Sequence, residues 1–123
     1  MILYRATQNK SDAKKIPAGS CWTPSREDAV AYLDRPNFAR RSYIVSIEIA
    51  DDASVLDLTS DDWGALADVL GRDPRETWTD GDLEYIEQAI DDRHIRSELA
   101  KNWAWVKYDD TFPDRCETWV RLC

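Results

Sequence analysis

The sequence predicts an α+β fold, with a mixed, mainly antiparallel sheet and with helices inserted between the early and the late strands. Residues 2–7 and 117–122, near the two ends of the chain, both have the aromatic and β-branched composition of strands. Between them, two segments beginning near residues 60 and 80 have apolar residues at helical spacing. Strands at both ends with helices between them predict an α+β protein in which the terminal strands are neighbours in one sheet.

The composition indicates one folded, acidic domain. The chain has 123 residues, of which 43% are hydrophobic and six are Trp, so we expect a single domain over residues 1–123. The formal net charge is −8. That charge disfavours general nucleic-acid binding, which needs a basic surface, and suits a basic protein partner.

The three cysteines predict neither a disulfide framework nor a zinc site. Cys21, Cys116 and Cys123 are odd in number and form no C-x-x-C pair. The first residues lack the layout of a signal peptide, and no apolar run approaches the length of a membrane span. We therefore expect a cytoplasmic protein with no membrane partner.

The elements are expected at regular intervals along the chain. The predicted strands cover residues 2–7, 20–23, 42–49, 54–59, 103–108 and 117–122. A loop at 8–18 has room for one helical turn. One helix is expected after Ser25 and another between Ser60 and Gly71. A longer helix opens at residues 80–82, and its inward positions are Leu83, Ile86, Ala89, Ile90 and Leu99.

Residues 19–33 are predicted to form a strand, a tight corner and a helix. Pro24 ends the strand because it has no N–H to donate, and Ser25 is a favourable N-cap with Asp28 three residues on. Hydroxyl and thiol side chains beside a helix N-terminus offer a place for a phosphate or a ribose. On these residues alone, a plain capped corner between strand and helix is the favoured explanation.

Two charged residues occupy strand positions where an apolar residue would be the simpler choice. Arg5 is either an edge charge or a clamp able to grip phosphate bidentately. Glu117 is either edge protection or a catalytic acid. His94, the one histidine, is expected at the surface. The adjacent acidic pairs point in different directions and predict no metal site.

Taken together, these segments resemble the mono-ADP-ribosyltransferase family, and in particular its small bacterial and phage members. Residues 3–7 (Leu-Tyr-Arg-Ala-Thr) resemble the arginine motif of that family. Residues 20–25, with the helix that follows, resemble its Ser-Thr-Ser strand. The strands at 43–49 and 55–59 are also similar. Glu117 takes the place of the catalytic glutamate by its order in the chain.

The resemblance implies an ADP-ribosyltransferase-like fold and an enzyme that transfers ADP-ribose from NAD to a macromolecule, with a protein as the expected target. Arg5 would bind the pyrophosphate of NAD, while Ser20 and Thr23 would hydrogen-bond the nicotinamide ribose or Glu117. Glu117 would stabilise the oxocarbenium-like charge that grows on the ribose as nicotinamide leaves. One aromatic ring would stack on the nicotinamide, and the candidates are Trp22, Tyr32 and Tyr43.

A different class of protein also fits the sequence. Arg115 stands two residues before Glu117, where family members that modify side chains carry Glu or Gln, so the acceptor is left open. The alternative is a non-catalytic acidic interaction protein, similar to an inhibitor or antitoxin, that covers a basic protein surface. Convergence of Arg5, Ser20 and Glu117 on one cleft would favour the enzyme, and side chains on different faces would count against this site.

Overall fold

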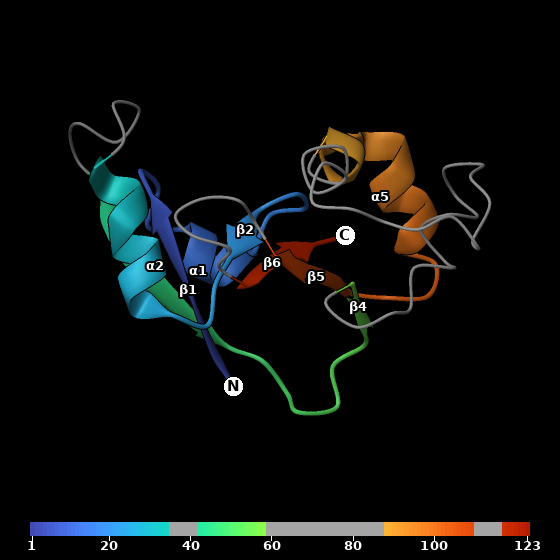
Figure 1. Cartoon of the computed structure of the whole chain (residues 1–123), viewed down its shortest axis with the longest axis horizontal. Coiled ribbons are helices and arrows are strands. Elements are labelled where there is room, and N and C mark those ends of the chain that lie inside the picture. Colours follow the sequence, from blue (N-terminus) through green and yellow to red (C-terminus); the bar gives the residue numbers. More distant parts are fainter. Residues whose placement is uncertain (35–41, 59–87, 110–116) are drawn as a thin grey trace.

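The computed structural model describes residues 1–34, 42–58, 88–109 and 117–123 (Figure 1). The strands in these ranges are β1 (Ile2–Thr7), β2 (Cys21–Trp22), β3 (Tyr43–Glu48), β4 (Val55–Asp57), β5 (Trp105–Asp109) and β6 (Glu117–Arg121). The helices are α1 (Asp12–Lys15), α2 (Arg26–Ala31), the 3-10 turn η1 (Tyr32–Asp34) and α5 (Arg93–Leu99). All six predicted strands are therefore confirmed, each to within about two residues at its ends.

The strands form two sheets. β1 pairs with β3, and the second sheet has the order β2-β6-β5-β4. β4 and β5 are parallel, whereas the other pairs are antiparallel. The protein is thus a small α+β fold with mixed pairing, as the sequence predicts.

The prediction that the terminal strands are neighbours is wrong. β1 pairs with β3, while β6 lies between β2 and β5. The corner before β2 fixes this arrangement, because Gly19 N–H donates to Arg121 O at 2.7 Å and Arg121 N–H donates to Ser20 O at 3.1 Å. β2 therefore occupies one edge of β6, and β5 occupies the other. No edge of β6 is left at which β1 could pair with it directly.

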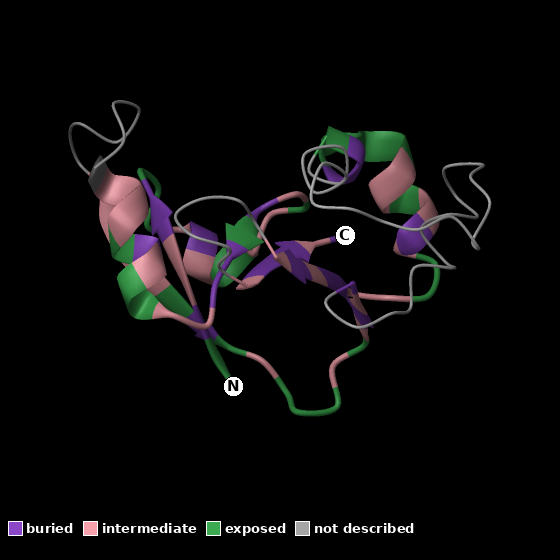
Figure 2. Ribbon diagram, in the orientation of Figure 1, coloured by how far each residue is buried: buried purple, intermediate pink, exposed green. Residues whose placement is uncertain are grey.

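The hydrophobic core has two parts, one on each face of the four-stranded sheet. On one face, side chains of β4, β5 and β6 pack with Ile90 and Leu99. On the other face lie Leu3, Trp22, Ile47, Trp105 and Trp119. Figure 2 shows buried residues concentrated along β5 and β6. These two strands therefore supply both faces of the core, which explains their dense hydrophobic and aromatic sequence.

The helix starts agree with the expected capping. Ser25 Oγ accepts from Asp28 N–H at 3.3 Å and begins α2, which packs against β1 (Figure 1). The long helix expected from residues 80–82 is interrupted, because Asp92 has an extended backbone and its carboxylate accepts from His94 and Ile95 N–H. Asp92 is thus an N-cap that starts a separate helix, α5.

The remaining predictions about helix positions are confirmed where the structure describes the residues. Ala89, Ile90 and Leu99 are buried and His94 is exposed, as expected. The helix expected between residues 60 and 71, together with Leu83 and Ile86, lies outside the described residues. In the part of the chain that the structure describes, no helix has the length and apolar character needed to cross a membrane.

Candidate functional site

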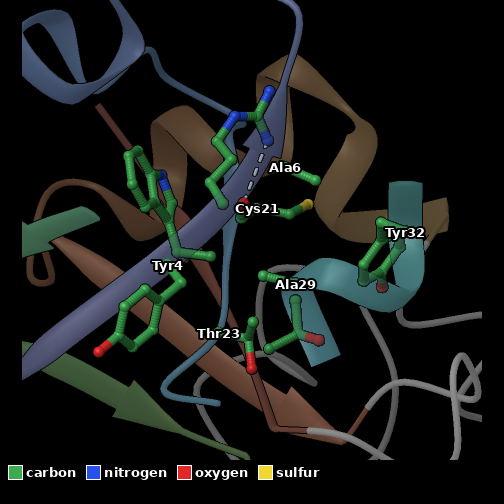
Figure 3. Close-up of a pocket in the computed structure, with 9 residues that line it drawn as sticks. Tyr4, Ala6, Cys21, Thr23, Ala29 and Tyr32 are labelled. Atoms are coloured by element: carbon green, nitrogen blue, oxygen red, sulfur yellow. Dashed lines mark hydrogen bonds between the residues drawn. The ribbon is translucent and has the colours of Figure 1, made fainter. Parts of the chain in front are cut away.

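The candidate site begins where β1 and β2 separate. The two strands meet at a single bridge, in which Tyr4 N–H donates to Thr23 O at 2.7 Å and Thr23 N–H donates to Tyr4 O at 2.9 Å. In a continued antiparallel ladder, the next hydrogen-bonded pair would be Ala6 with Cys21. Cys21 O instead accepts from Arg5 Nη1 at 3.1 Å, the bond drawn as a dashed line in Figure 3. The Arg5 side chain thus takes the place of a ladder bond.

A cavity of about 180 Å³ opens at this separation. Two tyrosines and a threonine are among its lining residues, and in the view of Figure 3 Tyr4 and Tyr32 stand on opposite sides of Thr23 and Ala29. The residues that line the cavity are Tyr4, Arg5, Ala6, Cys21, Trp22, Thr23, Ala29, Tyr32 and Thr118. The lining therefore combines one guanidinium with aromatic rings and hydroxyl groups.

The backbone of Ala6 adds a donor and an acceptor to the cavity. Because Tyr4 directs its N–H and C=O towards Thr23, alternation along β1 turns the same groups of Ala6 towards the β2 side. Among the described residues, the pairing of β1 with β2 stops at the Tyr4–Thr23 bridge. Ala6 is itself buried and lines the cavity, so its backbone amide is available to a ligand there.

The Arg5 side chain is held in place by the buried carboxylate of Asp12. Its Nε donates to Asp12 Oδ2 at 3.1 Å, and the same oxygen accepts from Thr7 Oγ1 at 2.6 Å. Burial raises the pKa of Asp12, but the hydrogen bonds from Thr7 and Arg5 and the positive charge of Arg5 outweigh it, so the pKa is lowered. Asp12 therefore stays ionised beside Arg5 at neutral pH.

Four of the seven predicted site residues line the cavity: Arg5, Trp22, Thr23 and Tyr32. Trp22, however, is 1% exposed and its indole Nε1 donates to Ser20 Oγ at 2.8 Å. Its ring belongs to the core cluster with Leu3 and Trp119. Ser20 is also buried and is not part of the cavity lining, and its hydroxyl fixes the Trp22 ring.

Tyr43 and Glu117 lie outside the cavity lining. Tyr43 is on β3, where Lys10 Nζ lies 4.4 Å from the centre of its ring. Glu117 Oε1 lies 3.5 Å from Lys107 Nζ. Successive strand residues point to opposite faces, so Glu117 faces away from Thr118, which lines the cavity. Of Arg5, Ser20 and Glu117, only Arg5 is in the lining.

The structure also adds residues that sequence reasoning did not single out: Tyr4, Ala6, Asp12 and Thr118. Alternation within β1 and β6 places such residues relative to their neighbours, but it does not say which face meets a cavity. Asp12 carries no motif, and its only sequence signal is an acid in the first turn of a short helix. Among the described residues, no group of three or more His, Cys, Asp or Glu side chains could hold a metal ion.

Comparison with known proteins gives no relative from which a role could be transferred. No family model, no curated protein and no solved structure matches the chain. The cavity and its residues are therefore the basis for a function.

Proposed function

We propose that the protein binds NAD in the cavity beside Arg5 and acts in the cytoplasm as a mono-ADP-ribosyltransferase-like protein on a protein target. The observation that carries the proposal is that the Arg5 guanidinium and the backbone amide of Ala6 both lie at the cavity where β1 and β2 separate. A guanidinium and a free strand amide side by side suit a ligand that carries both a phosphate and an amide.

NAD has groups that match this lining. Its carboxamide offers one acceptor and two donors, which complement the N–H and the C=O of Ala6. Its pyrophosphate suits the guanidinium of Arg5. Tyr4 and Tyr32 both line the cavity and supply rings on which the nicotinamide can stack, and Thr23 and Thr118 supply hydroxyl groups for a ribose.

The transfer step depends on Glu117. In the proposed reaction, Glu117 stabilises positive charge on the ribose, an effect commonly of about 3 kcal/mol for one well-placed group. Glu117 is next to Thr118 in the chain, yet it points to the opposite face of β6 and pairs with Lys107. For transfer to occur, the Glu117 carboxylate must leave Lys107 and reach the ribose around the end of β6, where Glu117 is the first residue.

Labelled NAD tests both steps. The wild type is incubated with NAD labelled in the adenylate half and with cell-lysate proteins, and both nicotinamide release and label transfer are measured. Glu117→Gln is expected to lower transfer about 100-fold or more. Asp109→Asn, on the strand position opposite Glu117, is the matched control and is expected to leave transfer unchanged. A wild-type protein that leaves NAD intact and labels nothing would overturn the transferase proposal.

The orientation of Glu117 favours a second candidate, an acidic interaction protein without catalysis. In that case the Lys107–Glu117 pair belongs to the surface of the fold, and the net charge of −8 attracts a basic protein partner. This candidate predicts that a partner binds with a strong dependence on salt concentration, while NAD remains uncleaved. It also predicts that Glu117→Gln leaves partner binding nearly unchanged, since one charge of many is removed.

A further inference from the structure

We propose that Asp12 is a positioning residue, which fixes the Arg5 guanidinium in the orientation that receives an anionic group in the cavity. The inference rests on the proposed function in one respect, namely that the anion is taken to be the pyrophosphate of NAD. Asp12 lines no part of the cavity itself, so its action on a ligand passes through Arg5.

Two hydrogen bonds on different nitrogens fix the plane of the guanidinium. Nε donates to Asp12 Oδ2 at 3.1 Å, and Nη1 donates to Cys21 O at 3.1 Å. These bonds use two of the five N–H groups of Arg5, so among the described residues three remain for a ligand. They also join Arg5 to both of its neighbours, α1 on one side and β2 on the other.

Asp12 is in turn fixed by its surroundings. It is 6% exposed, and Thr7 Oγ1 donates to its Oδ2 at 2.6 Å. Thr7 is in the same strand as Arg5, two residues on, so the two donors that hold Asp12 come from one face of β1. The carboxylate is therefore anchored by the strand whose arginine it orients.

Fixing a long side chain before a ligand arrives improves affinity, because the ligand does not have to order that side chain. The ordering of one rotamer-rich side chain corresponds to about a three- to tenfold change in the dissociation constant. Simple electrostatics predicts the opposite effect, since removal of a negative charge near an anion site strengthens anion binding. The two roles of Asp12 are therefore distinguished by the direction of the change.

The test measures the binding of inorganic pyrophosphate and of NAD by calorimetry, with the full chain. Asp12→Asn, which keeps the shape of the side chain, is expected to weaken pyrophosphate binding about three- to tenfold. In an Arg5→Lys background the same change is expected to cause no such loss, because a lysine lacks the Nε–H that Asp12 holds. Equal or tighter binding by Asp12→Asn, or the same loss in both backgrounds, would overturn the positioning role.

A spectroscopic measurement reports on the orientation of Arg5 directly. The Arg5 Nε–H resonance is expected to exchange slowly with water in the wild type and rapidly in Asp12→Asn. Thr7→Val, which keeps the Asp12 charge and removes its anchor, serves if Asp12→Asn does not fold. Thr7→Val is expected to accelerate the same exchange and to weaken pyrophosphate binding about twofold. If both quantities stay unchanged, the inference is contradicted.

The two ligands separate this inference from the proposed function. Binding of pyrophosphate with the expected dependence on Asp12, together with no binding of NAD, would overturn the proposed function alone. Binding of NAD that is insensitive to Asp12→Asn would overturn the positioning role alone. A wild-type protein that binds neither ligand would overturn both.

Discussion

The Glu117 carboxylate lies 3.5 Å from the Lys107 ammonium on the neighbouring strand β5. Lys107 also lies 3.2 Å from Asp57, and its ammonium is 5.4 Å from the centre of the Trp119 ring. Glu117 is thus one of two acids that share a lysine above a buried tryptophan. The Glu117 side chain remains 32% exposed, so these charges are only partly removed from water.

Glu117→Gln is expected to lower the free energy of unfolding by less than about 1 kcal/mol. Partly exposed ion pairs contribute little, and Asp57 still pairs with Lys107 in the variant. Urea unfolding followed by tryptophan fluorescence measures the change. A loss well above 2 kcal/mol would mean that Glu117 is a structural residue, and loss of transfer in the variant would then not report on catalysis.

The stability that Lys107 contributes is expected to disappear at high pH. Burial lowers the pKa of Lys107, but the hydrogen bond to Asp57 and the charges of Glu117 and Asp57 raise it more, so the pKa is higher in the folded state. A raised pKa stabilises the fold below the unfolded value, which is about 10.4, and this contribution is lost as pH rises through the folded value.

The comparison of wild type with Lys107→Met at several pH values isolates this contribution. Methionine keeps an apolar stem over Trp119, and every other side chain is common to the two proteins. The difference in unfolding free energy between the two proteins should be constant up to about pH 10 and should shrink above it. If the difference in unfolding free energy stays constant to pH 12, the pKa of Lys107 is not raised in the way described.

Ser20→Ala is expected to destabilise the fold by about 1–3 kcal/mol, because it leaves the buried Trp22 Nε1–H without its acceptor. Chemical denaturation of Ser20→Ala, Trp22→Phe and the double variant gives the coupling between the two residues. Since Ser20 is not part of the cavity lining, NAD affinity should not change. Reduced affinity with unchanged stability would instead support the ribose-binding role expected from the sequence.

Gly19→Ala is expected to cost about 1–2 kcal/mol in unfolding free energy. Gly19 has φ +82°, and an added Cβ would lie 3.0 Å from Arg96 Cζ. Arg96 Nη1 donates to Ile90 O and Asp91 O, so it cannot move away without loss of those bonds. Thermal unfolding measures the cost. In an Arg96→Ala background, the cost of the contact with Arg96 should vanish, and the cost of the positive φ at residue 19 should remain.

Cys21 provides a chemical probe of the cavity. Its thiol is exposed and its residue lines the cavity, whereas the exposed thiol of Cys123 lies outside the lining. Saturating NAD is expected to slow iodoacetamide alkylation of Cys21 severalfold and to leave Cys123 unaffected, as measured by mass spectrometry of the separate peptides. Equal rates at Cys21 with and without NAD would place the ligand elsewhere.

The candidate site could be predicted only in part. Arg5, Thr23 and Tyr32 were expected from strand and corner patterns, and they do line one cavity. Ser20 was expected to contact a ligand, but its hydroxyl holds Trp22. A serine in a short strand has the same sequence signal in either role, because the signal depends on backbone preference and not on what the side chain touches.

Local interactions allowed the sequence by itself to determine the strands and the Ser25 cap, and its composition fixes the acidic character of the protein. Alternation and capping depend on residues within a few positions of each other. Only the tertiary structure decided that β2 pairs with β6, that β1 and β2 separate after Tyr4, and that Asp12 holds Arg5. The first two depend on the choice of strand partner, which no local pattern encodes, and the third joins a helix side chain to a strand side chain that only the fold brings into contact.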